Sequence, residues 1–115
     1  MNLGEYVNVD RPGPTDSEIE WSAWLAHQMY GQPEVPTPCS SRCDVVTETH
    51  AWEVEWIKKW NQAPGQAVLY GLLLNKKPGV ILLSRKKRTE KVYYLRCFLV
   101  CREMGVALRV QNTMD

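Results

Sequence analysis

Apolar residues recur at every third or fourth position between residues 16 and 31, which is the period of a helix with one packed face. The polar residues at 15–17 are candidate helix caps, and Gly31 is a typical helix end. This pattern predicts a first helix over residues 16–31.

The pattern changes to the strand period in the next part of the chain. The Pro-rich segment 32–38 predicts only a short edge strand, because proline donates no hydrogen bond to a ladder. Residues 42–49 and 51–57 are rich in β-branched and aromatic side chains, with a turn expected at 48–50. We expect these two segments to pair as an antiparallel hairpin.

Helical and strand patterns alternate in the second half of the chain. Residues 58–79 predict a helix closed by the turn NKKPG, and residues 80–84 form a short apolar run typical of a buried strand. A Thr cap and a Gly stop predict a helix over 89–105. The last predicted strand is 106–111.

The order helix, three strands, helix, strand, helix, strand predicts an α/β fold, in which a mixed central sheet is flanked by helices. The 115 residues are enough for one hydrophobic core, so we expect a single domain over 16–115 after an irregular arm at 1–15. Three aromatic residues of the last predicted helix are expected in this core, namely Tyr93, Tyr94 and Phe98.

Carboxylates interrupt the strand predicted at 51–57, which otherwise has the composition of a core strand. Glu53 and Glu55 share one face of it, because alternate residues of a strand point the same way. The expected hairpin brings Asp44 across from Glu53. A carboxylate at low dielectric is costly unless it is paired, hydrogen-bonded or bound to a metal. Oxygen ligands favour a hard cation such as Mg²⁺ or Mn²⁺, and the alternative is a strand with one solvent-facing side.

Three motifs occur in the order typical of the PD-(D/E)XK nucleases. They are Asp44 on the second strand, the triplet Glu53-Val54-Glu55 on the third strand, and Gln66 with Tyr70 in the segment GQAVLYG. With the element order αβββαβ, nearly the whole chain resembles a small single-domain member of this superfamily. The resemblance implies a restriction-endonuclease-like core with an extra C-terminal helix and strand.

The resemblance also implies which residues form an active site. Asp44 and Glu53 would hold Mg²⁺ or Mn²⁺ together with the backbone carbonyl of Val54. Members of the family usually carry lysine at the third position of the triplet, where this chain has Glu55. Lys59 is the candidate to replace that lysine, positioning the attacking water and stabilising developing charge.

Lys59, Gln66 and Tyr70 are separated by seven and four residues, so we expect them on one face of the helix predicted at 58–79. In this interpretation Gln66 orients a ligand or phosphate, and Tyr70 braces the site through its hydroxyl. A polar cap and a packed aromatic residue are the alternative. Pro64 would kink the helix unless it lies in the first turn.

The first predicted helix carries a further candidate metal ligand. The resemblance implies a supporting acid there, for which Glu20 is the first choice and Glu18 the second. The alternative for both residues is an exposed, solvated side chain.

Four cysteines form two C-x3-C pairs, Cys39 with Cys43 and Cys97 with Cys101. A zinc site built from them would make the protein a zinc-stabilised adaptor. The spacing is one residue longer than in the commonest zinc knuckle, and Cys97 and Cys101 lie one helical turn apart, where they pack as small hydrophobes. We therefore favour buried free thiols.

The formal net charge is +1, so the chain has no general attraction to nucleic acid. Basic residues nevertheless gather before and after the strand predicted at 80–84. Such groups are solvated surface by default, and they bind a nucleic-acid backbone where their position allows it. The candidates are Lys58, Lys76, Lys77, Arg85, Lys86, Lys87 and Arg88.

These features favour a metal-dependent nuclease that hydrolyses phosphodiester bonds in DNA, in phage or bacterial DNA processing. So small a domain is expected to recognise backbone or structure, and a symmetric homodimer is compatible with this. The alternative is a catalytically inactive nuclease-fold module that binds nucleic acid or a protein partner, motivated by Glu55 and Pro64.

Composition adds an expectation about location. The hydrophobic fraction of 44% and the charged fraction of 23% are ordinary for a globular protein. The polar start of the chain does not match a signal peptide, and no apolar run approaches the ~18 residues of a membrane span. We therefore expect a cytoplasmic protein with no membrane partner.

Overall fold

The computed structural model describes residues 10–115, so residues 1–9 of the predicted arm lie outside the described part. Residues 10–17 contain a turn but no helix or strand. The elements are α1 (Glu18–Gln28), β1 (Gln32–Pro36), β2 (Arg42–Val46), β3 (His50–Trp56), η2 (Ile57–Gln62), α2 (Ala63–Leu74), β4 (Lys77–Ser84), η3 (Arg88–Glu90), α3 (Lys91–Met104) and β5 (Ala107–Asn112), where η marks a 3₁₀ segment.

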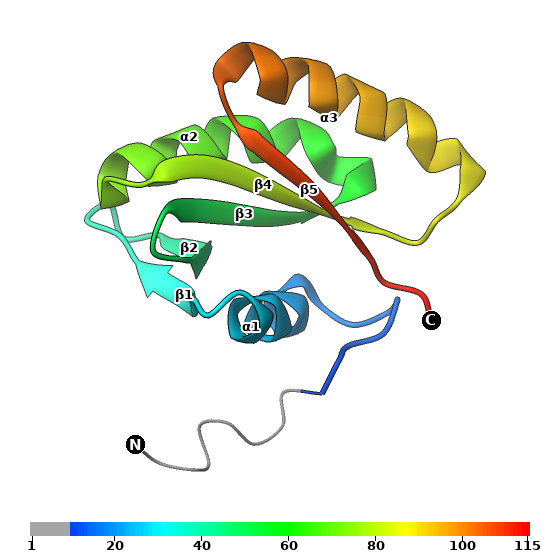
Figure 1. Cartoon of the computed structure of the whole chain (residues 1–115), viewed down its shortest axis with the longest axis horizontal. Helices are drawn as coiled ribbons and strands as arrows, with labels where there is room; N and C mark the ends of the chain where they lie inside the picture. The colour runs from blue at the N-terminus through cyan, green and yellow to red at the C-terminus, as the bar shows by residue number, and fades with distance from the viewer. Residues whose placement is uncertain (1–9) are drawn as a thin grey trace.

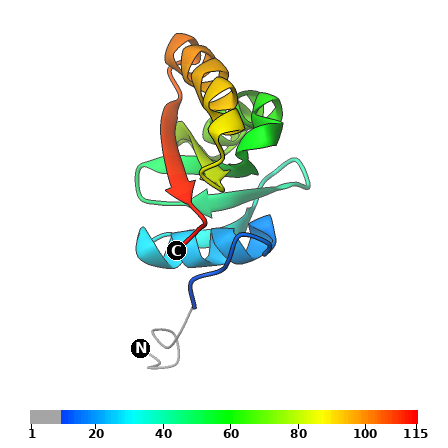
Figure 2. The same ribbon diagram turned by 90° about the vertical axis from the view of Figure 1, so that its right-hand side faces the viewer.

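The strands form one five-stranded sheet in the order β1-β2-β3-β4-β5. The first three strands pair antiparallel, whereas β3, β4 and β5 pair parallel. α1 covers one face of the sheet, and α2 and α3 cover the other (Figure 1, Figure 2). The predicted α/β fold with a mixed sheet flanked by helices is confirmed.

β3 lies in the middle of the sheet and is buried on both faces. Trp52 packs toward α1, while Ala51 packs beside Tyr70 of α2. Glu53 and Glu55 share the face of Ala51 and are only 8% and 7% exposed. The alternative of a strand with a solvent-facing acidic side is therefore wrong.

Apolar side chains fill the two spaces between the sheet and the helices. The layer under α1 consists of Trp21, Leu25, Ala26, Val45, Trp52, Val54, Ile81 and Leu83. The layer under α2 and α3 consists of Ile57, Ala63, Ala67, Val80, Leu82, Cys97, Cys101 and Val106.

The helix predicted at 58–79 is divided into η2 and α2. Pro64 lies in the first turn of α2, where its missing N–H breaks no helical hydrogen bond. Lys59 belongs to η2, and its φ of −104° and ψ of 25° lie outside the helical range. The prediction that Lys59 shares one helix face with Gln66 and Tyr70 is therefore wrong, because the chain bends before α2 begins.

α3 buries its cysteines rather than all its aromatic residues. The sulfur atoms of Cys97 and Cys101 lie 3.7 Å apart on the buried side of the helix. Tyr93 is partly buried, but Tyr94 and Phe98 are 41% and 38% exposed. The prediction of Tyr94 and Phe98 as core residues is wrong, because the buried stripe of α3 follows the cysteines.

The longest helix, α3, has 14 residues. Within residues 10–115, none of the helices has the length and apolar character needed to cross a membrane.

We predict that Gly79→Ala destabilises the fold by about 1–3 kcal/mol, because overpacking a filled core costs this much. Gly79 pairs with Trp52, and a Cβ added at Gly79 would lie 2.6 Å from Cζ3 of Trp52. Gly65→Ala is the matched control, because nothing lies within 4 Å of a Cβ there and alanine favours the helix. Urea unfolding followed by circular dichroism should give a lower midpoint for Gly79→Ala alone. Equal midpoints for the two variants would contradict the packing.

Candidate active site

β2 and β3 part at Asp44. The ladder between these strands ends at the pair Val45–Trp52. Asp44 is the next residue toward the start of β2, and its Oδ2 accepts the backbone N–H of Val54 at 2.8 Å. The carboxylate of Asp44 thus accepts a backbone hydrogen bond that a carbonyl of the neighbouring strand accepts elsewhere in the sheet.

A second carboxylate accepts a backbone hydrogen bond at the same edge of β3. Oε1 of Glu55 accepts the backbone N–H of Trp56 at 3.0 Å. The N–H and C=O of one strand residue point to the same side, so the carbonyl of Val54 also opens toward Asp44. This edge therefore presents two carboxylates and a backbone carbonyl within a few residues.

Glu53 lies between these groups and faces Asp44 in the antiparallel register. Its Oε2 is buried and has no hydrogen-bond partner among the described residues. Burial first, and the negative charge of Asp44 second, raise the pKa of Glu53 to about 10. Glu53 is therefore protonated at neutral pH unless a cation takes the place of the proton.

Asp44 and Glu55 are also held above their ordinary pKa values. Burial raises the pKa of Asp44, although the hydrogen bond from Val54 acts in the opposite direction. Burial raises the pKa of Glu55 to about 7, and Glu18 adds to this through a hydrogen bond and its negative charge. We call Glu18, Asp44, Glu53 and Glu55 the acidic site.

The first helix contributes Glu18, rather than Glu20, to this acidic site. Oγ of Ser17 accepts the N–H of Glu20 at 3.2 Å and donates to Oε1 of Glu20 at 3.3 Å. Glu20 is exposed and belongs to this helix cap, whereas Glu18 shifts the pKa values of the other three acids. The S-x-x-E spacing of a capping box was the sequence signal that distinguishes the two residues.

α2 places Tyr70 beside the acidic site and leaves Gln66 in solvent. Tyr70 packs with Cys43 and Ala51. Burial first, and the charge of Glu53 second, raise the pKa of the Tyr70 hydroxyl. Gln66 is exposed one helical turn earlier. The structure thus brings Tyr70, but not Gln66, next to the carboxylates.

Cys43 is a neighbour of the acidic site that the sequence pattern did not indicate. Its thiol donates to the carbonyls of Trp52 at 3.5 Å and Val45 at 3.6 Å. Burial raises its pKa to about 12, so the thiol stays neutral beside the carboxylates. Its place directly before Asp44 is the only sequence signal for this role.

Lys59 supplies positive charge to the acidic site from η2. The side chain is exposed, and its charge lowers the pKa of Glu55, opposing the effect of burial. Lys59 therefore lies close enough to Glu55 to act on it electrostatically, although it does not belong to α2.

The donor set fits a cation held by two carboxylates. Within residues 10–115, no three or more His, Cys, Asp or Glu side chains are grouped so that they could hold a metal ion. Asp44 and Glu53 are nevertheless within hydrogen-bonding reach of each other, and Oε2 of Glu53 has no partner in the described part of the chain. Mg²⁺ commonly binds one or two carboxylates and completes its shell with water and substrate phosphate. These residues therefore fit Mg²⁺ or Mn²⁺ bound in this way.

The four cysteines are free thiols. Cys43, Cys97 and Cys101 are buried as predicted, whereas Cys39 is exposed. Across the residues that the structure describes, none of them joins a metal-binding group of three or more such side chains.

The predicted nucleic-acid-binding residues lie in separate places. Lys76 and Lys77 lie at the start of β4, where Nζ of Lys76 donates to the carbonyl of Glu48 at 2.7 Å. Residues 85–88 follow the end of β4, roughly 20–25 Å away at the rise of an extended strand. Lys58 is exposed on η2. The two basic groups therefore lie at opposite ends of β4.

Comparison of the chain with protein-family models, with curated proteins and with solved structures gives no match. The resemblance to PD-(D/E)XK nucleases therefore rests on the sequence motifs and on the positions described above.

We predict that Glu53→Gln raises the free energy of unfolding of the metal-free protein at pH 8 by about 1–3 kcal/mol. Glutamine keeps the shape of the side chain and carries no charge to bury. The folded-state pKa of about 10 lies above the ordinary value of 4.5. The native state therefore binds the extra proton between these values, and the stability of the natural protein falls as the pH rises.

Urea unfolding at pH 5, 7 and 9 in the presence of a chelator measures this decline. Glu53→Gln should remove most of it, and the exposed control Glu20→Gln should leave it in place. The same pH slope in the natural protein and in Glu53→Gln would contradict the account of Glu53.

Proposed function

We propose that the protein is a cytoplasmic, metal-dependent nuclease that hydrolyses phosphodiester bonds in DNA. The observation that carries this proposal is Oε2 of Glu53, buried beside Asp44 with no partner in the described residues. An unsatisfied buried polar group costs about 1–3 kcal/mol, and a ligand that satisfies it removes this cost. A divalent cation would satisfy this oxygen and remove the repulsion between the two carboxylates.

The cation would be held by Asp44, Glu53 and the backbone carbonyl of Val54. When bound, Mg²⁺ or Mn²⁺ polarises a phosphate and lowers the pKa of a water molecule. The hydrogen bond from Val54 to Asp44 fixes the direction of that carboxylate before any ligand arrives. This preorganisation supports a site for chemistry, because carboxylates that turn freely bind a cation with less precision.

Lys59 and Glu55 have separate roles in this proposal. Lys59 orients the attacking water and offsets the negative charge that develops on the phosphate. Glu55 accepts a proton from that water. The water oxygen forms a bond to phosphorus while the bond from phosphorus to the leaving deoxyribose oxygen breaks, and that oxygen takes up a proton from solvent water. The products are one phosphate end and one hydroxyl end.

Tyr70 supports the site from α2, whereas Gln66 faces solvent on the same helix. The buried Tyr70 side chain packs against β3 next to Glu53 and limits the movement of that carboxyl group. Gln66 is exposed and free to donate its amide to a phosphate of bound DNA. Tyr70 is thus a positioning residue, and Gln66 is a substrate contact.

A nuclease-fold binding module without activity is the second candidate. The observation that favours it is Glu55, which stands where the resemblance implies lysine. In that case the acids would have lost their affinity for Mn²⁺, whereas the acids of a working site should bind Mn²⁺ measurably, and no DNA would be cut.

We predict that the purified protein cuts plasmid or linear DNA with Mg²⁺ or Mn²⁺ and that Glu53→Ala lowers the rate at least about 100-fold. Gel electrophoresis of the DNA measures this, with a chelator as one control and Glu20→Ala as the matched acidic variant. Glu20→Ala should keep the natural rate. A folded protein that cuts no form of DNA would support the binding module instead.

We predict that Lys59→Ala lowers kcat by about 10²–10³-fold, because removing one group that stabilises developing charge has this effect. Lys58→Ala is the control, since its side chain is exposed on the same η2 segment. It should keep kcat at saturating DNA. Equal losses of kcat in the two variants would show that Lys59 has no special place in the reaction.

A further inference from the structure

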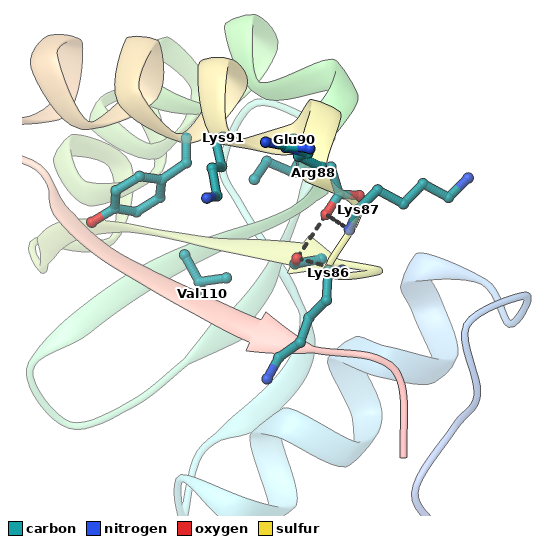
Figure 3. A pocket seen from close by; sticks show the side chains of 9 residues that line it. Lys86, Lys87, Arg88, Glu90, Lys91 and Val110 are labelled. Carbon is teal, nitrogen blue, oxygen red and sulfur yellow. Dashed lines mark hydrogen bonds between the residues drawn. The ribbon is translucent and has the colours of Figure 1, made fainter.

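A pocket of about 900 Å³ lies between the loop after β4, the start of α3 and β5 (Figure 3). Ile57, Tyr94 and Val110 contribute apolar and aromatic surface to it. Four basic residues also line it, namely Lys86, Lys87, Arg88 and Lys91. We call this the basic pocket, and it shares no residue with the acidic site.

Glu90 organises the loop but does not neutralise these side chains. Its Oε1 accepts hydrogen bonds from Oγ of Ser84 at 2.8 Å and from the N–H of Lys87 at 3.3 Å. Its Oε2 accepts the N–H of Arg85 at 3.2 Å. The buried carboxylate is therefore used within the loop, and the charges of the basic pocket remain available to a ligand.

Arg85 anchors the loop and is not part of the basic pocket. Its Nε donates to the carbonyl of Pro14 at 2.8 Å, and its guanidinium carbon lies 3.9 Å from the ring centroid of Trp56. Thr113 adds a hydrogen bond from Oγ1 to the carbonyl of Ser84 at 2.9 Å. The backbone that presents the basic side chains is thus fixed by contacts on both sides.

The basic side chains take different directions from this fixed loop. Figure 3 shows Lys91 pointing into the space between α3 and β5, whereas Lys86 extends past the end of β5. Lys86, Lys87, Arg88 and Lys91 are all exposed. Cations spread along a concave surface suit several phosphates in succession better than they suit a single small anion.

Tyr94 provides an aromatic surface next to these cations. It lines the basic pocket and is 41% exposed. Its other neighbour is Phe98, which stacks on it with a centroid distance of 6.2 Å and does not line the basic pocket. An exposed aromatic ring beside a basic groove is the combination with which proteins stack the bases of single strands.

The basic pocket lies on the same face of the sheet as the acidic site. Glu55, Leu82 and Val110 form one row across β3, β4 and β5. Two strand spacings, about 10 Å, separate the backbone at Glu55 from that at Val110. Parallel sheets bind ligands at the carboxyl ends of their strands, and the basic pocket lies at this end of β4 and β5.

We propose that the basic pocket binds a single-stranded segment of the nucleic-acid substrate, with phosphates at Lys86, Arg88 and Lys91 and a base against Tyr94. This inference rests on the proposed nuclease function and names its substrate class as DNA with a single-stranded part. A base in a duplex is already paired and stacked, so only an unpaired base reaches an aromatic ring inside a pocket.

Binding of a fluorescein-labelled 12-nucleotide oligo-dT to the full chain tests this, measured by anisotropy with a chelator and no divalent cation. Lys91→Ala should weaken binding about fivefold or more and lower the salt slope by about 0.7. Tyr94→Leu should weaken it about tenfold. The matched controls are Arg96→Ala, which is exposed on α3 outside the basic pocket, and Phe98→Leu, which breaks the same ring stack outside the basic pocket. Both should bind as the natural protein does.

Three results would overturn the proposal. One is equal weakening by Tyr94→Leu and Phe98→Leu in folded variants. Another is tighter binding of a blunt duplex that is insensitive to Tyr94→Leu. The third is complete displacement of the oligonucleotide by micromolar thymidine monophosphate, which would assign the basic pocket to a free nucleotide. Circular dichroism of each variant checks that it is folded.

The same assay separates this inference from the nuclease proposal. Glu20→Ala, which is exposed outside both sites, should bind oligo-dT as tightly as the natural protein and keep the natural rate of cleavage. Cleavage of DNA by a protein that does not bind oligo-dT would contradict the assignment of the basic pocket but not the nuclease proposal. Binding of oligo-dT that depends on Lys91 and Tyr94, in a protein that cleaves no DNA, would support the assignment of the basic pocket and contradict the nuclease proposal.

Discussion

The hydrogen bond from the N–H of Val54 to the carboxylate of Asp44 is the interaction on which the arrangement of the acidic site depends. β2 leaves β3 at this point, and a buried strand edge without partners would be costly because its amides are removed from water. Asp44 and Glu55 satisfy the amides of Val54 and Trp56 with side-chain oxygens. The strands can therefore part in the interior of the protein, and carboxylates gather where a ladder would otherwise continue.

The position of β3 explains why these carboxylates are so perturbed. It is the central strand of the sheet, so α1 closes one face and α2 the other. An acid on such a strand has little access to water, and burial is the first cause of each raised pKa in the group. Glu18 on α1 and Lys59 on η2 then change the charge around these acids, from the helix before β1 and from the segment directly after β3. The raised pKa values thus depend on the helices that cover both faces of the sheet as much as on β3 itself.

Glu90 and Glu53 show two different outcomes for a buried carboxylate in one fold. Glu90 has donors on both oxygens, and its role is complete within the loop that it organises. Glu53 has an oxygen with no donor among the described residues, so its environment suits a positive ligand. The first acid supports a basic surface and the second faces other acids, which places opposite charge on neighbouring parts of one sheet face. Such a surface suits a phosphate chain that is held at one point and polarised at another.

The sequence by itself determined the order of the helices and strands, the mixed sheet and the position of Asp44 across from Glu53, because periodicity, turns and hairpin register are local properties. It also indicated a helix cap among residues 15–17, of which the structure uses Ser17, although the role of Glu20 in that cap was missed. Only the tertiary structure decided that β3 is central, that Glu18 joins the acids, that Lys59 lies on η2, and that Tyr94 lines a pocket. These features depend on which layers cover a residue and on how chain segments meet across the fold. No spacing within one segment encodes such contacts, because their energy arises from burial and charge contributed by distant residues.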